Sequence, residues 1–245
     1  MADCDVTIRQ AIELIRSRRF QEAIALLVPA EREARVEGKV LDRIRLLRHA
    51  GICHFELDDS AAAEACFKEC LDQANAIDSD LERVNAQHEL SLIYARRQEL
   101  DKAIDANKDA VRILSSATIL PGAERMGGKD QLLAQHAQTL GVLLMEKGEL
   151  DKSERALRVA EKAFATLADN PGLARTLNEL GLVALQQKNP TVSAEAFCRS
   201  IALKVELQDM HGIQTGLRNV QVLLQRHPEA RMVPCIQDLI AQLSR

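Results

Sequence analysis

Five stretches of this sequence align with one another at a nearly constant spacing. The tetrapeptide Glu-Leu-Asp-Lys occurs at residues 99–102 and again at 149–152, and every stretch carries a small residue at two fixed places. The first place is occupied by Ala11, Gly51, Ser91, Gly141 and Gly181. The second place is occupied by Ala23, Ala63, Ala103, Ser153 and Ser193, which lie 40, 40, 50 and 40 residues apart. A period in this range indicates a repeat protein built from one supersecondary unit used many times.

Each repeat has the pattern of two amphipathic helices, because apolar residues recur at i, i+3, i+4 and i+7 on both sides of a short polar turn. Glycine inside a helix costs roughly 1 kcal/mol relative to alanine, so Gly51 and Gly181 indicate a close approach of the paired helices. One such hairpin cannot bury its apolar face alone, whereas a stack can. The sequence therefore predicts an all-α fold, an α-solenoid of stacked helix-turn-helix repeats.

The same alignment predicts how the chain is organised. We expect a single superhelical domain over residues 1–245, with an insertion at about 115–130 where the step is 50 instead of 40. Pro234 is placed to begin a C-terminal capping helix. Its apolar stripe consists of Ile236, Leu239, Ile240 and Leu243. The expected units are about 5–40, 41–80, 81–120, 131–170, 171–210 and 211–245.

Composition excludes several classes of protein. The 32 basic and 36 acidic residues give a net charge of −4, which provides no bulk attraction for nucleic acid. No apolar run approaches the roughly 20 residues that a membrane-spanning helix needs. The first residues lack the basic and apolar regions of a signal peptide, and six cysteines are too few for a disulfide scaffold. These features predict a cytoplasmic protein with neither nucleic acid nor a membrane as its partner.

The repeats resemble tetratricopeptide repeats in their longer-helix form of roughly 40 residues, similar to those of kinesin light chains. The first-helix signature of that family, Leu-Gly-x-x-Tyr, is matched in part at Leu90-Ser91 with Tyr94, at Leu140-Gly141 and at Leu180-Gly181. The second-helix alanine and aromatic residue are matched at Ala63 with Phe67 and, with serine for alanine, at Ser193 with Phe197. The chain lacks the tryptophan of the family and most of its tyrosines. HEAT and armadillo repeats have a similar period and are the structural alternative.

The resemblance implies that the first helix of each pair lines a concave wall, which is the usual binding surface of such a stack. Periodicity assigns ten positions to the first half of this face, and they hold four arginines and no acid although the chain is acidic overall. Arg, Asn and Gln can donate to a carboxylate or an extended peptide backbone. We expect the partner-binding residues to be Arg45, Arg48, Asn85, His88, Gln135, Gln138, Arg175, Asn178 and Arg218. In the alternative interpretation these side chains pair with acids on neighbouring helices and only hold the stack together.

The sequence thus favours a protein-interaction module or scaffold, without catalysis or a cofactor, that binds a peptide or helix with acidic groups and an apolar anchor in this groove. A clamp for an acidic chaperone tail fits poorly, because the corresponding places hold Arg48, Ile52 and Glu89. Two other hypotheses stay open. One is a self-associating array that forms a homo-oligomer, and the other is an enzyme or a metal- or thiol-dependent sensor. The sensor would use a cluster around Cys53, Cys66 and Cys70.

Overall fold

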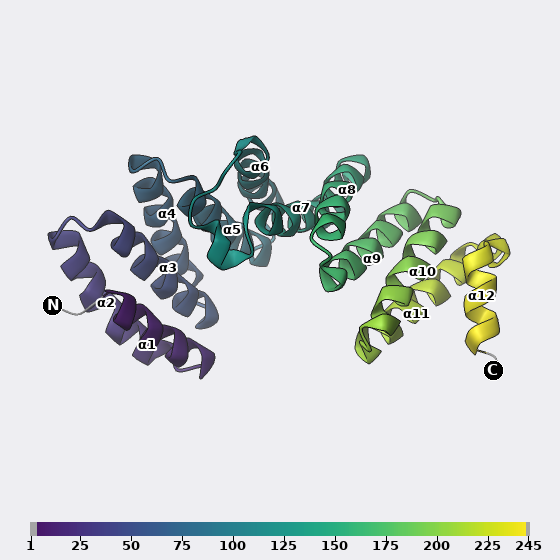
Figure 1. Cartoon of the computed structure of the whole chain (residues 1–245), viewed down its shortest axis with the longest axis horizontal. Helices are drawn as coiled ribbons and strands as arrows, with labels where there is room; N and C mark the ends of the chain where they lie inside the picture. The colour runs from purple at the N-terminus through teal and green to yellow at the C-terminus, as the bar shows by residue number, and fades with distance from the viewer. Residues whose placement is uncertain (1–3, 244–245) are drawn as a thin grey trace. The chain divides into compact units, whose positions relative to one another are not determined.

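A computed structural model describes residues 4–243, apart from the side chains of residues 125, 126, 242 and 243. Within this range the chain is helical, without a strand, and the two helices of each pair pack against each other as antiparallel neighbours (Figure 1). The chain divides into two compact units, one ending at Ala123 and the other beginning at Glu124. The structure confirms the predicted all-α solenoid of helix pairs. A single domain over 1–245 stays a prediction.

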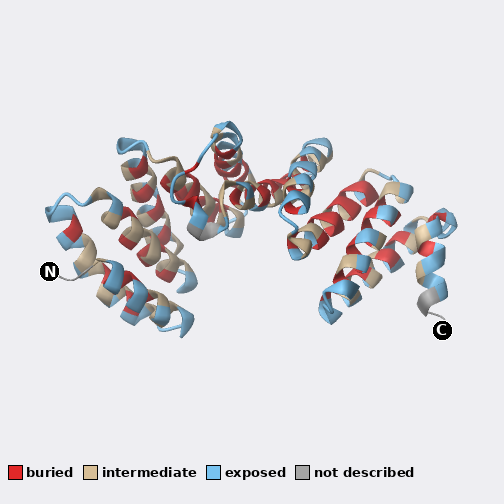
Figure 2. Cartoon of the chain, in the orientation of Figure 1, coloured by how far each residue is buried: buried red, intermediate tan, exposed pale blue. Residues whose placement is uncertain are grey.

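The first unit contains three helix pairs. They are α1 (Cys4–Arg16) with α2 (Phe20–Val36), α3 (Val40–Glu56) with α4 (Ser60–Ala76), and α5 (Asp80–Arg96) with α6 (Leu100–Ser116). The second unit contains α7 (Lys129–Glu146) with α8 (Leu150–Thr166), α9 (Asn170–Gln186) with α10 (Pro190–Glu206), and α11 (Met210–Arg226), followed by a 3-10 segment η2 (Pro228–Met232) and α12 (Pro234–Leu243). In each unit the buried residues gather on the faces that the helices turn toward one another (Figure 2).

The turns between helices share one backbone conformation. In each of nine turns one residue is left-handed, with φ between 51° and 82°, and neighbouring turns of a unit are 20 residues apart. The next residue then donates its N–H to a carbonyl five positions back, as Asp169 does to Phe164 at 3.0 Å. This is the hydrogen bond that ends a helix at a left-handed residue. The left-handed residues are Arg18, Gly38, Asp58, Asp78, Gln98, Gly148, Ala168, Lys188 and Gln208.

Small residues bring the paired helices close together, as predicted from the repeat. A Cβ atom on Gly51 would lie 2.6 Å from the Phe67 ring, and one on Gly181 would lie 2.5 Å from the Phe197 ring. Both rings are fully buried, so the aromatic side chain of the second helix fills the space that glycine leaves on the first. Interiors are packed as tightly as organic crystals, and little room remains for an added methyl group.

Residues 117–128 form a loop that contains one short 3-10 segment, η1 (Ala123–Met126), at the place of the predicted insertion. The loop is not detached from the first unit, because Leu120 is buried and a Cβ on Gly122 would lie 3.0 Å from a methyl carbon of Leu81. The extra residues are therefore used as a packed loop, and the helices on either side keep their ordinary length.

The predicted capping helix is α12, which packs on α10 and on η2. Ile236 is fully buried, whereas Ile240 keeps 43% of its surface exposed. The stripe predicted for this helix is thus only partly covered. Of its four members, the Leu243 side chain lies outside the described residues.

Candidate partner-binding site

The nine predicted partner-binding residues all lie on the first helices of the pairs, and each compact unit carries its own set. The second unit holds Gln135 and Gln138 on α7, Arg175 and Asn178 on α9, and Arg218 on α11. Gln135, Arg175 and Arg218 are exposed, and Gln138 is half-buried. The structure therefore presents most of this set to solvent, where a partner can reach it.

Asn178 differs from the others because only 8% of its surface is exposed. Its Oδ1 atom accepts a hydrogen bond of 2.8 Å from Nδ2 of Asn219 on α11, and its own Nδ2 donates to Glu179 at 3.5 Å. An amide that is buried and already bonded on both sides is poorly placed to contact a ligand. Asn178 thus joins the first helices of two neighbouring pairs, as the structural alternative expected for such residues.

Arg175 lies one turn before Asn178 on α9, and Arg218 is next to Asn219 in the sequence of α11. Neither guanidinium forms an ion pair or a side-chain hydrogen bond with any residue that the structure describes. A partly buried apolar residue, Leu182, follows Asn178 by one turn. The second unit therefore offers two unpaired cations next to apolar surface on its first helices.

Two charged residues beneath this face were not predicted. Lys204 on α10 is only 6% exposed, and burial lowers the pKa of its ammonium while Asp209 and Glu179 raise it. Burial raises the pKa of the Glu179 carboxyl, against the hydrogen bond from Asn178 and the charge of Lys204. Lys204 occupies the repeat position that Phe164 holds one period earlier. That break in the repeat is the sequence signal that could have revealed it.

In the first unit Arg45 forms ion pairs with two acids. Its guanidinium lies 2.8 Å from the carboxylate of Asp5 on α1 and 3.8 Å from that of Asp42 on its own helix. Asn85 on α5 is buried and donates to the carboxylate of Glu82 at 3.4 Å. Arg45 thus fits the structural alternative, pairing with an acid on a neighbouring helix, whereas Asn85 bonds an acid on its own helix.

Arg48 on α3 and His88 on α5 lie in a half-buried group of charged and titratable side chains. Burial lowers the pKa of His88 and raises that of Glu89, and the charge of Arg48 lowers both. Burial together with Arg48 and Arg45 lowers the pKa of His49 to about 4. The Nε atom of Arg48 is buried and has no hydrogen-bond partner in the described part of the chain. The acid Glu89 is thus the neighbour in sequence of the predicted residue His88. The prediction took only two positions from each first helix and therefore did not include it.

The cysteines of the proposed sensor cluster are parts of the core. Cys53 and Cys70 are buried, and the Cys70 thiol donates to the Ile44 carbonyl oxygen at 3.4 Å. Burial raises the pKa of Cys53 and of Cys66 to about 11. Among the described residues no group of three or more His, Cys, Asp or Glu side chains is arranged to hold a metal ion. No helix in residues 4–243 combines the length and apolarity needed to cross a membrane.

Comparisons with known proteins agree with this architecture. Two family models, both described as tetratricopeptide repeat, match residues 42–116 and 139–204, which together make up more than half of the chain. This chain is a tetratricopeptide repeat protein. The finding confirms the resemblance read from the Gly and Ala positions and decides against the HEAT and armadillo alternative. No curated protein sequence matches this tetratricopeptide repeat chain.

Solved tetratricopeptide-like structures share its fold at low sequence identity. The apo form of RapI superposes with a TM-score of 0.74 at 13% identity, covering 94% of this chain and 85% of RapI. BtubC from P. vanneervenii gives 0.67 at 14% identity, covering 100% and 91% of the two chains. The TPR-like repeats of a putative kinesin light chain from Podosopora anserina give 0.65 at 14% identity, covering 85% and 99%. The tetratricopeptide repeat fold suggests a scaffold for protein–protein interaction, and proteins of this family are generally non-catalytic.

Proposed function

We propose that this protein is a non-catalytic scaffold that binds a peptide or helix with acidic groups on the first-helix face of its second unit. The observation that carries the proposal is the pair of exposed, unpaired guanidinium groups of Arg175 and Arg218 beside the Asn178–Asn219 hydrogen bond. In stacked helical repeats this face lines the concave wall, the usual binding surface.

The chemistry of these residues supports an acidic partner. A guanidinium presents N–H donors in a planar fork that matches the two oxygens of a carboxylate. The Asn178–Asn219 bond joins α9 to α11, the two helices that carry Arg175 and Arg218. Leu182, partly buried one turn further along α9, offers a surface for an apolar anchor on the same segment. A carboxylate flanking an apolar side chain is thus the pattern that suits this face.

The second unit is favoured over the first because its cations are available. Arg45 in the first unit is already paired with Asp5, and Arg48 lies beside the half-buried carboxyl of Glu89. A carboxylate of the partner would have to displace Asp5 from Arg45. At Arg48 it would be repelled by the nearby carboxyl of Glu89 when that group is ionised. Arg175 and Arg218 carry neither cost.

We place the protein in the cytoplasm and expect neither nucleic acid nor a membrane to bind it. Its six cysteines are free thiols, as is usual in a reducing compartment. Its net charge of −4 gives no bulk attraction for a polyanion.

A displayed library of random peptides selected on the full chain tests the proposal. We expect the enriched peptides to carry Asp or Glu next to an apolar residue, and to lose at least about tenfold in affinity for an Arg175→Glu, Arg218→Glu variant. Binding should also weaken with added salt, because the contact is between exposed charges. The matched control is Arg155→Glu with Arg231→Glu. It reverses the charge of two exposed arginines that do not lie on a first helix. Enriched peptides without acids, or equal losses in both double variants, would refute the proposal.

A further inference from the structure

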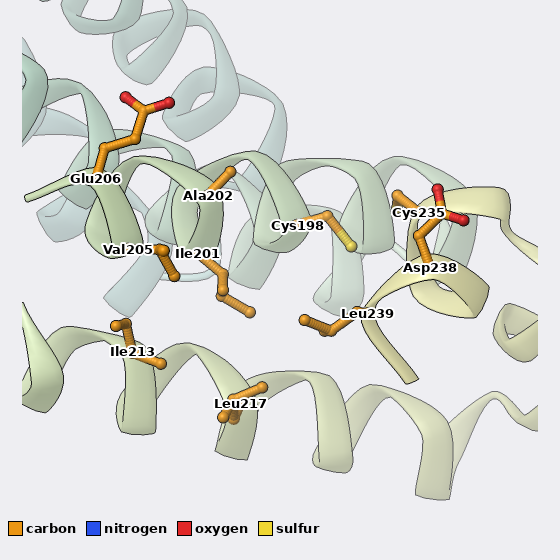
Figure 3. Close-up of a pocket in the computed structure, with 10 residues that line it drawn as sticks. All are labelled: Cys198, Ile201, Ala202, Val205, Glu206, Ile213, Leu217, Cys235, Asp238 and Leu239. Carbon is orange, nitrogen blue, oxygen red and sulfur yellow. The ribbon is translucent and has the colours of Figure 1, made fainter. Parts of the chain in front are cut away.

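The second unit contains an apolar crevice on a different set of helices, α10, α11 and α12. Its volume is about 460 Å³. Ile201 and Val205 of α10 line one wall, Ile213 and Leu217 of α11 line the opposite wall, and Leu239 of α12 reaches in between them (Figure 3). Pockets of this size take a small molecule or a few side chains of a partner.

The crevice exists because no helix within residues 4–243 packs on α11 as the second helix of a pair, as one does on every earlier first helix. In the earlier pairs a small residue on the first helix lets the second helix approach closely, as Gly181 leaves room for the ring of Phe197. The corresponding position of α11 holds Gln221, which is exposed. The next helix, α12, packs on α10 and η2 instead. The face of α11 that carries Ile213 and Leu217 therefore lines an open space.

The charged residues of the crevice have a single sign. Glu206 of α10 and Asp238 of α12 line it at opposite ends, and among the residues that the structure describes no Lys, Arg or His lines it (Figure 3). Neither carboxylate forms an ion pair with any residue in the described part of the chain. Val205 in the wall between them is 56% exposed, a large fraction for an apolar side chain. An occupant would need apolar side chains for the walls and positive charge for the two ends.

We propose that this crevice binds an amphipathic helix of a partner protein, with apolar side chains against α10 and α11 and Lys or Arg residues opposite Glu206 and Asp238. Such a helix would take the place of the missing second helix of the last pair. A helix laid into an apolar groove is a common mode of recognition, with anchors at i, i+3, i+4 and i+7. The surface and the charge preference both differ from those of the first-helix face, so the inference does not depend on the proposed function.

Two synthetic helical peptides test the proposal on the full chain. Both carry Leu at i, i+3, i+4 and i+7, and one has Lys and the other Glu at the flanking positions. We expect the Lys peptide to bind and to shift the methyl NMR resonances of Ile201, Val205 and Leu217. Its affinity should fall at least about tenfold for Val205→Asp and for Glu206→Lys with Asp238→Lys. Val36→Asp, which changes a valine on α2 that is even more exposed (88% against 56% for Val205), is the control and should bind as the wild type does.

Three results would overturn the proposal. The first is no binding of the Lys peptide, or equal binding of the Glu peptide. The second is a shift of the Leu182 methyl resonances in place of those in the crevice, which would assign the peptide to the first-helix face. The third is a dimer in sedimentation experiments that Val205→Asp dissociates, since a second copy of the chain would then be the occupant. The Arg175→Glu, Arg218→Glu variant should bind the Lys peptide normally, so the two proposals can fail separately.

Discussion

The Ser193 hydroxyl on α10 donates a hydrogen bond of 2.8 Å to the carbonyl oxygen of Gly181 on α9. Ser153 on α8 makes the same bond to Gly141 on α7, at 2.6 Å. These two serines replace the alanines that the repeats of the first unit carry at the same position. The second unit therefore adds a polar contact at the point where each helix pair is closest.

Removing this bond should cost a measurable part of the stability. We expect Ser193→Ala to lower the free energy of unfolding by about 1 kcal/mol, because the buried bond is lost while the volume is nearly kept. Gly181→Ala should cost more, about 1–3 kcal/mol, since the new Cβ would meet the buried Phe197 ring at 2.5 Å. Urea denaturation measures both. A Gly181→Ala variant as stable as the wild type would show that the ring can move aside.

Substitutions at two left-handed turn residues should change the stability of the protein in opposite directions. Ala168 has φ +54° and Gly148 has φ +82° at the same place in two successive turns. A Cβ atom is strained in this conformation, so Gly148→Ala should lower stability by about 1 kcal/mol and Ala168→Gly should raise it by a smaller amount. A Cβ on Gly148 would meet nothing within 4 Å, so backbone strain alone is tested. Thermal unfolding of both variants provides the comparison, and a loss of stability in each would contradict the assignment.

The repeat arithmetic was enough to predict the helix pairs and their close contacts. Gly51, Gly181 and the small residues opposite them have a packing role that a helical period alone reveals. The turn conformation was harder to predict from the sequence, because six different residue types occupy the left-handed position. Only the glycines among them, Gly38 and Gly148, indicate a positive φ. In the earlier pairs the second helix packs on the first, whereas α12 packs on α10 and η2. The apolar stripe of α12 alone could not predict this difference. It follows from Gln221 on α11, where every earlier repeat carries a small residue.

The half-buried carboxyl of Glu179 predicts a pH-dependent effect on stability. Burial raises its pKa in the folded state, so the folded chain is penalised once the pH exceeds the ordinary glutamate pKa and the carboxyl of the unfolded chain ionises. The penalty grows until the pH passes the raised pKa. Glu179→Gln should therefore raise the urea midpoint at pH 7 and leave it nearly unchanged at about pH 3, below both pKa values. The exposed Glu195→Gln on the neighbouring helix α10 is the control, and an equal gain at both values of pH would contradict the prediction.

The core thiols should resist chemical modification. Cys53 and Cys70 are buried, and burial raises the pKa of both, that of Cys53 to about 11. Because the thiolate is the reactive form, we expect both to stay unlabelled by maleimide at pH 7 until the chain is unfolded in urea. Mass spectrometry of the labelled peptides gives the result residue by residue. Rapid labelling of Cys70 in the native protein would revive the thiol-sensor hypothesis.

The candidate site was harder to predict than the fold. Periodicity identified which residues lie on the first helices, and it could not tell that Arg45 is paired with Asp5 while Arg175 and Arg218 are not. Ion pairing depends on contacts between helices far apart in sequence, such as α1 with α3. The buried Asn178–Asn219 bond is of the same kind, because it joins residues 41 positions apart.

The 20-residue spacing of the left-handed turns has a consequence for changes in chain length. One residue added inside a helix would rotate all later side chains of that helix by about 100° and move the next turn out of step with its neighbours. A peptide tag or a reporter domain inserted there should therefore abolish folding of the whole unit. The loop at 117–128 already breaks the spacing, so an insertion there that leaves the buried Leu120 in place should be tolerated.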